Sequence, residues 1–297
     1  MGSLVDMKNS YKNHKWLIPA TILITIFACR SATNKYSGPA GYDFSSPEKF
    51  IMPESLLEIS GIALHQGNGK VIYSVQDEEG RLFKQNWGDA KQTSVKFGSN
   101  GDYEDVAILN ETVFILKSSG TILSFPLSET SKKKTENVKQ WKNILPKGEY
   151  EGLYADQEKQ TLYALCKECS VDKKTQDATG YVFNYDAKAG ALAIGADFKI
   201  KGEQLEALGH PIKSGLKAAA LAKNPQTGEW YILSSVHKLL VIANPDWTIK
   251  AAYPLNPADF LQPEGIAFDH EFNLYISNEG DEISAGNILK FNYTAEK

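Results

Sequence analysis

Short apolar stretches alternate with turn-forming residues along most of the chain, and one four-residue pattern recurs among them. The five copies are Ser60-Gly61-Ile62-Ala63, Glu104-Asp105-Val106-Ala107, Glu151-Gly152-Leu153-Tyr154, Ala219-Ala220-Leu221-Ala222 and Glu264-Gly265-Ile266-Ala267. Their first residues are 44, 47, 68 and 45 positions apart, and an aromatic residue follows each copy after 10 to 13 positions. A third apolar stretch then follows in most copies, such as Arg81–Gln85 and Leu239–Ala243. Each copy therefore predicts at least three short β-strands separated by turns.

A period near 45 residues with three or four strands per unit is typical of β-propeller blades. Five copies predict an all-β, five-bladed propeller, and the wider spacing of 68 residues leaves a six-bladed propeller as the alternative. We favour an insertion there, because residues 166–180 are polar like an extended hairpin and residues 201–217 have the composition of a loop. Residues 49–57 are expected to supply the strand that closes the ring against Asn287–Tyr293.

The N-terminal pattern is that of a secreted protein. Lys8, Lys12 and Lys15 precede an apolar run over residues 16–28, which is too short to span a bilayer. The end of this run, Ile26-Phe27-Ala28-Cys29, resembles a bacterial lipobox. Cys29 is then the lipidated first residue of the mature chain, and the alternative is a plain signal peptide followed by a free cysteine.

The lipobox divides the chain into a signal peptide (1–28), a flexible tether (29–48) and a propeller domain (49–297). Ser, Gly, Pro and Asn are frequent in the tether, as in flexible linkers. A lipid on Cys29 predicts a membrane-anchored protein of the cell envelope that faces the periplasm. Arg30 follows the cysteine in place of Asp, which by resemblance to Gram-negative sorting rules favours the outer membrane over the inner one.

Composition narrows the classes of partner. With 42% hydrophobic and 23% charged residues the chain is globular rather than disordered. Its net charge of −4 becomes −6 once the signal peptide's three Lys and one Asp are removed, which disfavours nucleic acid. The glycine-rich stretches lack both phosphate-binding patterns, so a nucleotide is disfavoured too. The expected partners are the membrane, through the lipid, and an unknown protein or periplasmic ligand.

Several ordered motifs between about Leu56 and Phe291 resemble the SdiA-regulated family of bacterial envelope proteins. They are Glu58-Ile59-Ser60-Gly61, Val75-Gln76-Asp77-Glu78-Glu79-Gly80, Gly101-Asp102-Tyr103-Glu104-Asp105-Val106-Ala107, Leu165-Cys166-Lys167, Leu233-Ser234-Ser235, Gln262-Pro263-Glu264-Gly265-Ile266-Ala267 and Leu274-Tyr275-Ile276-Ser277-Asn278-Glu279-Gly280. Lys217-Ala218-Ala219 departs from the family's more usual Pro-Ser-Ala. The resemblance implies a five-bladed propeller, distantly similar to NHL-repeat propellers, with a bound calcium ion. It implies no activity.

The first position of the repeated pattern places one residue per blade around the central channel. This ring consists of Ser60, Glu104, Glu151, Ala219 and Glu264. Converging carboxylates repel one another unless a cation neutralises them, and carboxylate oxygens are ligands that Ca²⁺ prefers. The ring has no His or Cys, which disfavours zinc and copper. The predicted calcium ligands are Glu104, Glu151 and Glu264, with Glu58 in place of Ser60 and Asp77 as the next candidate.

A second interpretation needs no metal, because these glutamates can instead cap backbone N–H groups or pair with lysines. A matching ring four residues after each aromatic position consists of Asp77, Ser118, Lys167, Ser235 and Glu279, and Lys117 lies beside it. The sequence leaves both interpretations open.

The cysteines and histidines give no catalytic pattern. Cys166 and Cys169 form a single C-x-x-C, which predicts either a local disulfide or a free pair. The histidines that remain after signal removal fall at apparent turns; they are His65, His210, His237 and His270.

Three functions remain compatible with the sequence. The leading interpretation is a non-catalytic binding module with a calcium-binding propeller, to which we assign no catalytic residue. The alternative is a calcium-dependent hydrolase, resembling lactonase, esterase or phytase propellers in using a channel metal to polarise its substrate. The third is a purely structural envelope protein.

Overall fold

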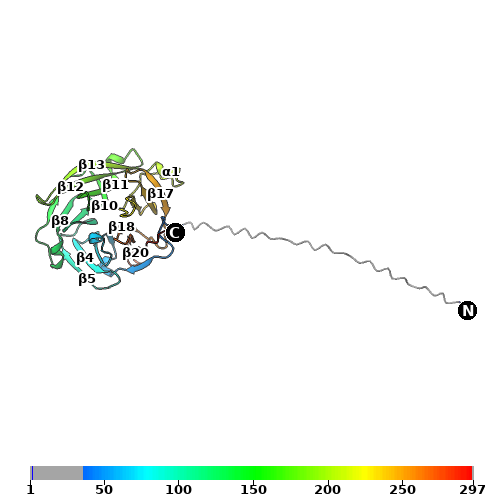
Figure 1. Cartoon of the computed structure of the whole chain (residues 1–297), viewed down its shortest axis with the longest axis horizontal. Helices are drawn as coiled ribbons and strands as arrows, with labels where there is room; N and C mark the ends of the chain where they lie inside the picture. The colour runs from blue at the N-terminus through cyan, green and yellow to red at the C-terminus, as the bar shows by residue number, and fades with distance from the viewer. Residues whose placement is uncertain (1, 3–35, 296–297) are drawn as a thin grey trace. The chain divides into compact units, whose positions relative to one another are not determined.

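The computed structural model describes Gly2 and residues 36–295. Within residues 36–295, five antiparallel sheets of four strands each are arranged in a ring (Figure 1). Inner strands such as β10 and β18 lie toward the centre of the ring, and outer strands such as β5 and β13 lie at its periphery. The five-bladed β-propeller is confirmed. The predicted signal peptide and Cys29 lie outside the described residues.

Each blade runs from an inner to an outer strand. The first consists of β2 (Ile59–Ala63), β3 (Val71–Gln76), β4 (Arg81–Asn86) and β5 (Gln92–Lys96). The second consists of β6 (Tyr103–Leu109), β7 (Thr112–Lys117), β8 (Ile122–Pro126) and β9 (Lys139–Trp141). The third consists of β10 (Gly148–Asp156), β11 (Thr161–Cys169), β12 (Asp177–Asp186) and β13 (Ala191–Lys201). The fourth consists of β14 (Ala220–Lys223), β15 (Trp230–Ser234), β16 (Leu239–Ala243) and β17 (Ile249–Pro254).

The fifth blade joins the two ends of the propeller. It consists of β18 (Pro263–Phe268), β19 (Leu274–Asn278), β20 (Asn287–Phe291) and β1 (Glu48–Ile51). β1 runs antiparallel to β20, with Ile51 opposite Asn287. The predicted closing strand is therefore confirmed, although it is shorter than the segment 49–57.

The wide spacing between the third and fourth copies of the repeat is an insertion. Strands β11, β12 and β13 have 9, 10 and 11 residues, and the chain then passes through a loop that contains the one-turn helix α1 (Gln204–Ala207). The β11–β12 connection is held by Asp172, which accepts hydrogen bonds from the backbone N–H and the hydroxyl of Thr179. The described residues contain no sixth sheet. Four 3₁₀ turns, η1 (Glu54–Leu56), η2 (His65–Gly67), η3 (Leu127–Ser131) and η4 (Ser170–Asp172), complete the elements.

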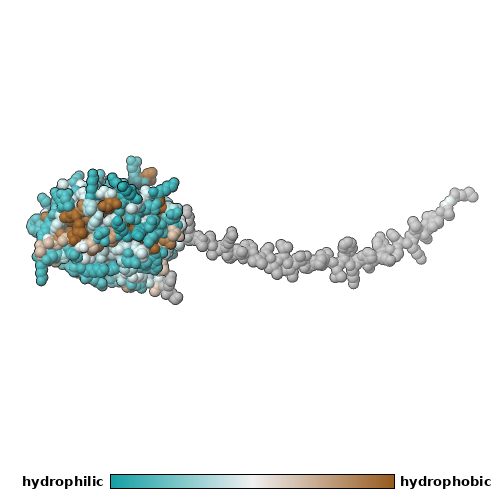
Figure 2. All heavy atoms as spheres, turned by 90° about the horizontal axis from the view of Figure 1, so that it is seen from above, coloured by the Kyte–Doolittle hydropathy of each residue, from teal (hydrophilic) through white to brown (hydrophobic). Residues whose placement is uncertain are grey.

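Aromatic side chains fill the spaces between neighbouring blades. Phe198 of the third blade stacks on Trp247 of the fourth, with ring centroids 3.7 Å apart, and Trp247 stacks on Trp230 at 4.3 Å. Large aromatic surfaces bury the most apolar area per residue, so these contacts hold adjacent blades face to face. The face of the propeller seen in Figure 2 is mainly hydrophilic, with hydrophobic patches.

The described part of the predicted tether packs on the propeller. Tyr42 and Phe44 are only 6% and 4% exposed and belong to the apolar cluster between the fourth and fifth blades. Phe44 stacks on Phe291 with ring centroids 4.4 Å apart, and the Tyr42 hydroxyl donates to the carbonyl of Phe272. The expectation of a free linker up to residue 48 is therefore wrong for residues 42–44, because these two aromatic residues gain burial by covering the last blade.

The repeated pattern exists because the inner strands approach one another closely. A Cβ on Gly61 would overlap the carboxyl group of Asp105 in the next blade, and a Cβ on Gly265 would overlap the hydroxyl of Ser277 and the carbonyl of Ser60. Glycine at the second position of the pattern therefore lets neighbouring blades meet at the channel.

The second blade has Asp105 at this position instead of glycine. Its carboxyl group is buried and accepts hydrogen bonds from the N–H of Val106 in its own strand and of Leu153 in the third blade, at 2.7 and 2.6 Å. Asp105 therefore connects the second and third blades. The N–H of Leu153 lies at the edge of an inner strand, and no further strand in the described residues pairs with it.

Candidate functional site at the acidic mouth of the channel

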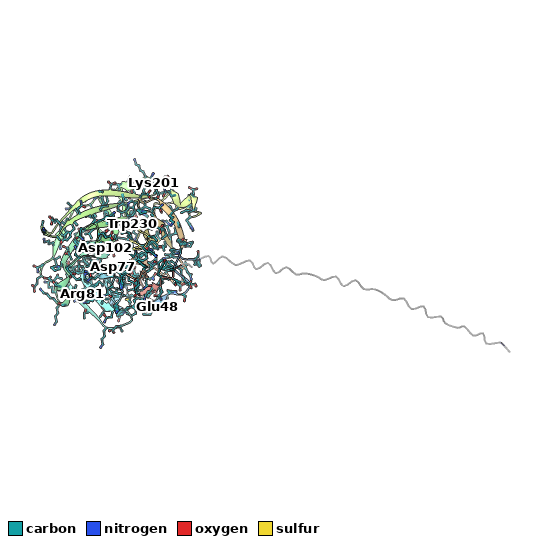
Figure 3. The ribbon with its side chains drawn as sticks, in the orientation of Figure 1. Glu48, Asp77, Arg81, Asp102, Lys201 and Trp230 are labelled. Carbon is teal, nitrogen blue, oxygen red and sulfur yellow. A yellow bond between two sulfur atoms is a disulfide. The ribbon has the colours of Figure 1, made fainter. Side chains whose placement is uncertain are left out.

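The inner strands all begin at one end of the channel, which we call the acidic mouth. Glu104, Glu151 and Glu264 lie at or near the starts of β6, β10 and β18. Asp77 and Asp102 come from loops at the same end, and Figure 3 shows them beside each other toward the middle of the ring, whereas Arg81 and Lys201 lie at its periphery. Side chains from four blades thus contribute carboxyl groups to one mouth.

The three predicted glutamates affect one another's ionisation. Burial, followed by the charge of Glu151, raises the pKa of Glu104 well above its usual range, and Glu264 contributes to the same rise. Burial and the charge of Glu264 raise the pKa of Glu151 to about 7, although Lys167 acts in the opposite direction. Burial raises the pKa of Glu264 to about 7 as well. The structure therefore brings Glu104, Glu151 and Glu264 within electrostatic reach of one another.

A second group of carboxyls adjoins the first. Burial and the charges of Glu58, Glu78 and Asp102 raise the pKa of Asp77 to about 6. Burial, Asp77 and Glu58 raise the pKa of Glu279 to about 7. The predicted candidates Glu58 and Asp77 therefore lie at the same mouth, together with Glu279 of the matching ring.

Lys167 contributes a positive charge to this mouth, and a backbone irregularity places it there. Lys167 and Glu151 are both left out of the register between β10 and β11, and their side chains form an ion pair. Burial alone lowers the pKa of Lys167, but the charges of Glu151, Glu264 and Glu104 outweigh it and raise the pKa above its usual value. Cys166 and Cys169 form a disulfide across this irregular segment, so the predicted C-x-x-C fixes the local geometry of Lys167.

Polar side chains support Glu264 and Glu279. The hydroxyl of Ser235, predicted as part of the second ring, hydrogen-bonds to Glu264 and lowers its pKa, but burial outweighs this effect. The amide of Gln262 donates to Glu279. Nearby, Lys238 donates to the carbonyl of Leu261 at 2.6 Å, and burial lowers its pKa. Lys238 was not singled out from the sequence, because it lies in a turn outside both ring positions.

Two buried carboxylate oxygens at this mouth have no hydrogen-bond partner among the described residues. They are Oε2 of Glu151, whose side chain is 9% exposed, and Oδ1 of Asp77. A buried acceptor without a donor is costly, and a cation is one way to satisfy it. In the described part of the chain no group of three acidic, histidine or cysteine side chains is placed so that it could hold a metal ion. Carboxylate oxygens are the donors that a hard cation prefers, and Glu151 is already paired with Lys167.

Other residues singled out from the sequence have structural roles. Ser60 accepts a hydrogen bond at its carbonyl from the Ser277 hydroxyl at 2.6 Å, which joins the fifth blade to the first. Lys117 lies over the ring of Tyr103, with its Nζ 4.8 Å from the ring centroid, rather than beside a carboxylate. Lys217 pairs with Glu168 at 2.7 Å. Ala219 is buried and supplies no polar group.

The histidines lie at turns or in loops, as expected. His65 is at the start of η2, and its Nε2 lies 3.1 Å from the carbonyl of Asn110. His237 contacts the carbonyl of Gly215 at 3.3 Å. His270 donates from Nδ1 to the carbonyl of Gly67. His210 follows α1.

Comparison with known proteins supports the fold and gives no family. No model of a known protein family matches the chain, and no curated protein matches it. The resemblance to the SdiA-regulated family is therefore not confirmed.

Solved structures share the architecture at low sequence identity. Myxococcus xanthus glutaminyl cyclase has 12% identity and a TM-score of 0.55, covering 83% of this chain and 95% of its own. The WD40 repeats of RRP9 have 9% identity and a TM-score of 0.51, covering 83% of this chain and 98% of that one. A luciferin-regenerating enzyme has 11% identity and a TM-score of 0.50, covering 84% and 98%. The chain is thus a β-propeller protein, and at these identities the likeness concerns the fold alone.

Proposed function

We propose that the protein is a calcium-binding β-propeller of the bacterial cell envelope that serves as a non-catalytic binding module. The metal site is proposed from the acidic mouth, where Glu151 Oε2 is buried with no donor from residues 36–295 and lies among carboxyls with raised pKa values. Glu104, Glu151 and Glu264 would hold the ion, with Glu58 and Asp77 beside them. Bound Ca²⁺ would neutralise this end of the channel and hold the blades together.

Calorimetry on the full chain after treatment with a chelator tests the site. We expect saturable Ca²⁺ binding that weakens by roughly tenfold or more in Glu104→Gln and in Glu264→Gln. Glu158→Gln is the matched control, because Glu158 is exposed on a turn that follows β10 at the other end of the channel. Absence of Ca²⁺ binding to the unmodified protein would contradict the metal site, and the glutamates would then serve only in ion pairing with Lys167.

The envelope location is proposed from the lipobox at residues 26–29. The disulfide between Cys166 and Cys169 supports an oxidising compartment. No helix in the described residues is long and apolar enough to cross a membrane. Metabolic labelling with a radioactive fatty acid should mark the full chain and should fail for Cys29→Ser. Labelling of that variant, or a cytoplasmic location in cell fractionation, would contradict the proposal.

The alternative function is a calcium-dependent hydrolase. A panel of lactones, aryl esters and phosphoesters, assayed with Ca²⁺ and with a chelator, separates it from a binding module. Turnover that is lost with the chelator and in Glu151→Gln would replace the binding-module proposal. Crosslinking in intact envelopes, followed by purification of the protein, tests for a partner; an empty result favours a purely structural role.

A further inference from the structure

A cavity of about 290 Å³ lies where the five inner strands end. We call it the far mouth, because the carboxyls of the acidic mouth lie where the same strands begin. Its lining comes from all five blades and from the turns that follow the inner strands. None of the predicted calcium ligands is among its lining residues.

Aliphatic side chains form the inner wall of the far mouth. They occupy the third position of the repeated pattern, one from each blade, and are Ile62, Val106, Leu153, Leu221 and Ile266. All five are buried. Such a wall gives water few hydrogen-bond partners, so it favours the apolar body of a ligand over ordered solvent.

The polar groups at the rim are mostly engaged with one another. Asp269 accepts four hydrogen bonds at 2.9 Å, from the N–H groups of Glu271 and Asn273, the amide of Asn273 and the hydroxyl of Tyr275. Gln157 donates to the carbonyl of Ile108 and accepts from the N–H of Asn110. Neither residue offers its main hydrogen-bonding group to a ligand.

Lys223 is different, because its ammonium group keeps spare donors. Of its three N–H groups, one donates to Asp156 Oδ2 at 3.2 Å, and the described residues provide no second acceptor. Asp156 also accepts two backbone N–H groups at 3.1 Å, from Glu158 and Lys159, which already disperse part of its charge. Lys223 is therefore a cationic donor at the rim, beside the exposed amide of Gln66 and the Nε2 of His270, which lies in a ring already held through its Nδ1.

We propose that the far mouth binds a small carboxylate with an apolar body. The carboxylate would accept hydrogen bonds from Lys223, and the apolar body would lie against the aliphatic wall. The cavity volume equals that of about ten molecules of liquid water, which suits a chain of roughly six carbons or a single ring. This site is independent of the calcium proposal.

Titration of the full chain with hexanoate and with hexylamine tests the proposal, because the two probes share an apolar body and differ in charge. We expect hexanoate to bind saturably and to raise the melting temperature, and hexylamine to bind at least about tenfold more weakly.

Two variants locate the binding. Lys223→Met should weaken hexanoate about tenfold and remove the preference over hexylamine, whereas Lys159→Met on the neighbouring exposed turn should change neither. Ala155→Leu, which narrows the cavity without removing a charge, provides a second test if Lys223→Met does not fold. Absence of hexanoate binding, or hexanoate binding that both Lys223→Met and Ala155→Leu leave unchanged, would overturn the proposal.

Discussion

The two mouths of the central channel are formed by the same five inner strands, and their chemistry is opposite. At the acidic mouth, carboxyls such as Glu104 and Glu264 are held near one another, and their pKa values are raised by burial and repulsion. At the far mouth, two positions further along the same strands, aliphatic residues such as Leu221 pack without conflict. The acidic mouth therefore lowers the free energy of unfolding, as functional sites often do. The buried aliphatic residues of the far mouth raise it.

The largest effect is expected from the stabilising end. Leu221→Ala should lower the free energy of unfolding by about 2–5 kcal/mol, because a fully buried leucine leaves a cavity between blades. Chemical denaturation measures this change. Ile194→Ala is the matched control, since Ile194 is 46% exposed and should lose no more than about 0.5 kcal/mol. Equal losses of unfolding free energy in both variants would show that the aliphatic side chains of the far mouth do not stabilise the fold.

Asp105 tests the link between blades. Asp105→Asn removes one of two acceptors for the N–H groups of Val106 and Leu153, and we expect a loss of about 1–3 kcal/mol. Asp186→Asn is a close control, because Asp186 also accepts two backbone N–H groups but is exposed. If the two substitutions have the same effect in denaturation, the contact between blades does not matter for stability.

The acidic mouth should make stability depend on pH in an unusual direction. Glu151, Glu264 and Glu279 have pKa values of about 7 in the fold, above the ordinary value of 4.5, so the folded state holds more protons than the unfolded state between these values. In chelator, stability should therefore fall as pH rises from about 4.5 to above 7. After allowance for solvent screening we expect about 1–2 kcal/mol.

Melting temperatures at pH 5 and pH 8 measure this slope. Saturating Ca²⁺ should flatten it, because the ion binds the ionised carboxylates, and Glu104→Gln should flatten it without Ca²⁺. A melting temperature that rises steadily from pH 5 to pH 8 in chelator would show that burial and charge repulsion do not raise the pKa values of these carboxyls.

The smallest effect concerns Lys167, which shares the acidic mouth with the proposed ion. Lys167→Met removes a competing positive charge, so Ca²⁺ affinity should rise roughly tenfold. Lys117→Met should leave the affinity unchanged, because Lys117 lies over Tyr103. Weaker Ca²⁺ binding in Lys167→Met, measured by calorimetry, would mean that the lysine supports the site instead of competing for it.

How far the sequence predicts the fold depends on which strand is considered. The first three strands of each blade were predicted because they are buried and apolar, as in the third strand β16 (Leu239–Ala243), where the predicted and observed bounds agree. Outer strands such as β9 (Lys139–Trp141) and β13 (Ala191–Lys201) were not predicted individually, because exposed positions dominate them. The burial of Tyr42 and Phe44 was missed because the surrounding Ser, Gly and Pro residues resemble a linker.

From the sequence alone, five copies of the repeated pattern favour five blades over six, since three of their four spacings lie between 44 and 47 residues and a blade cannot bury both its faces alone. The sequence also placed Glu104, Glu151 and Glu264 at one mouth, because equivalent positions of a ring of blades must meet. Only the tertiary structure decided that Lys167 enters this mouth, since that depends on an irregular register between β10 and β11. The far mouth, and the ion pair that holds the Lys223 ammonium group at its rim, depend likewise on contacts between residues distant in sequence, which no local pattern encodes.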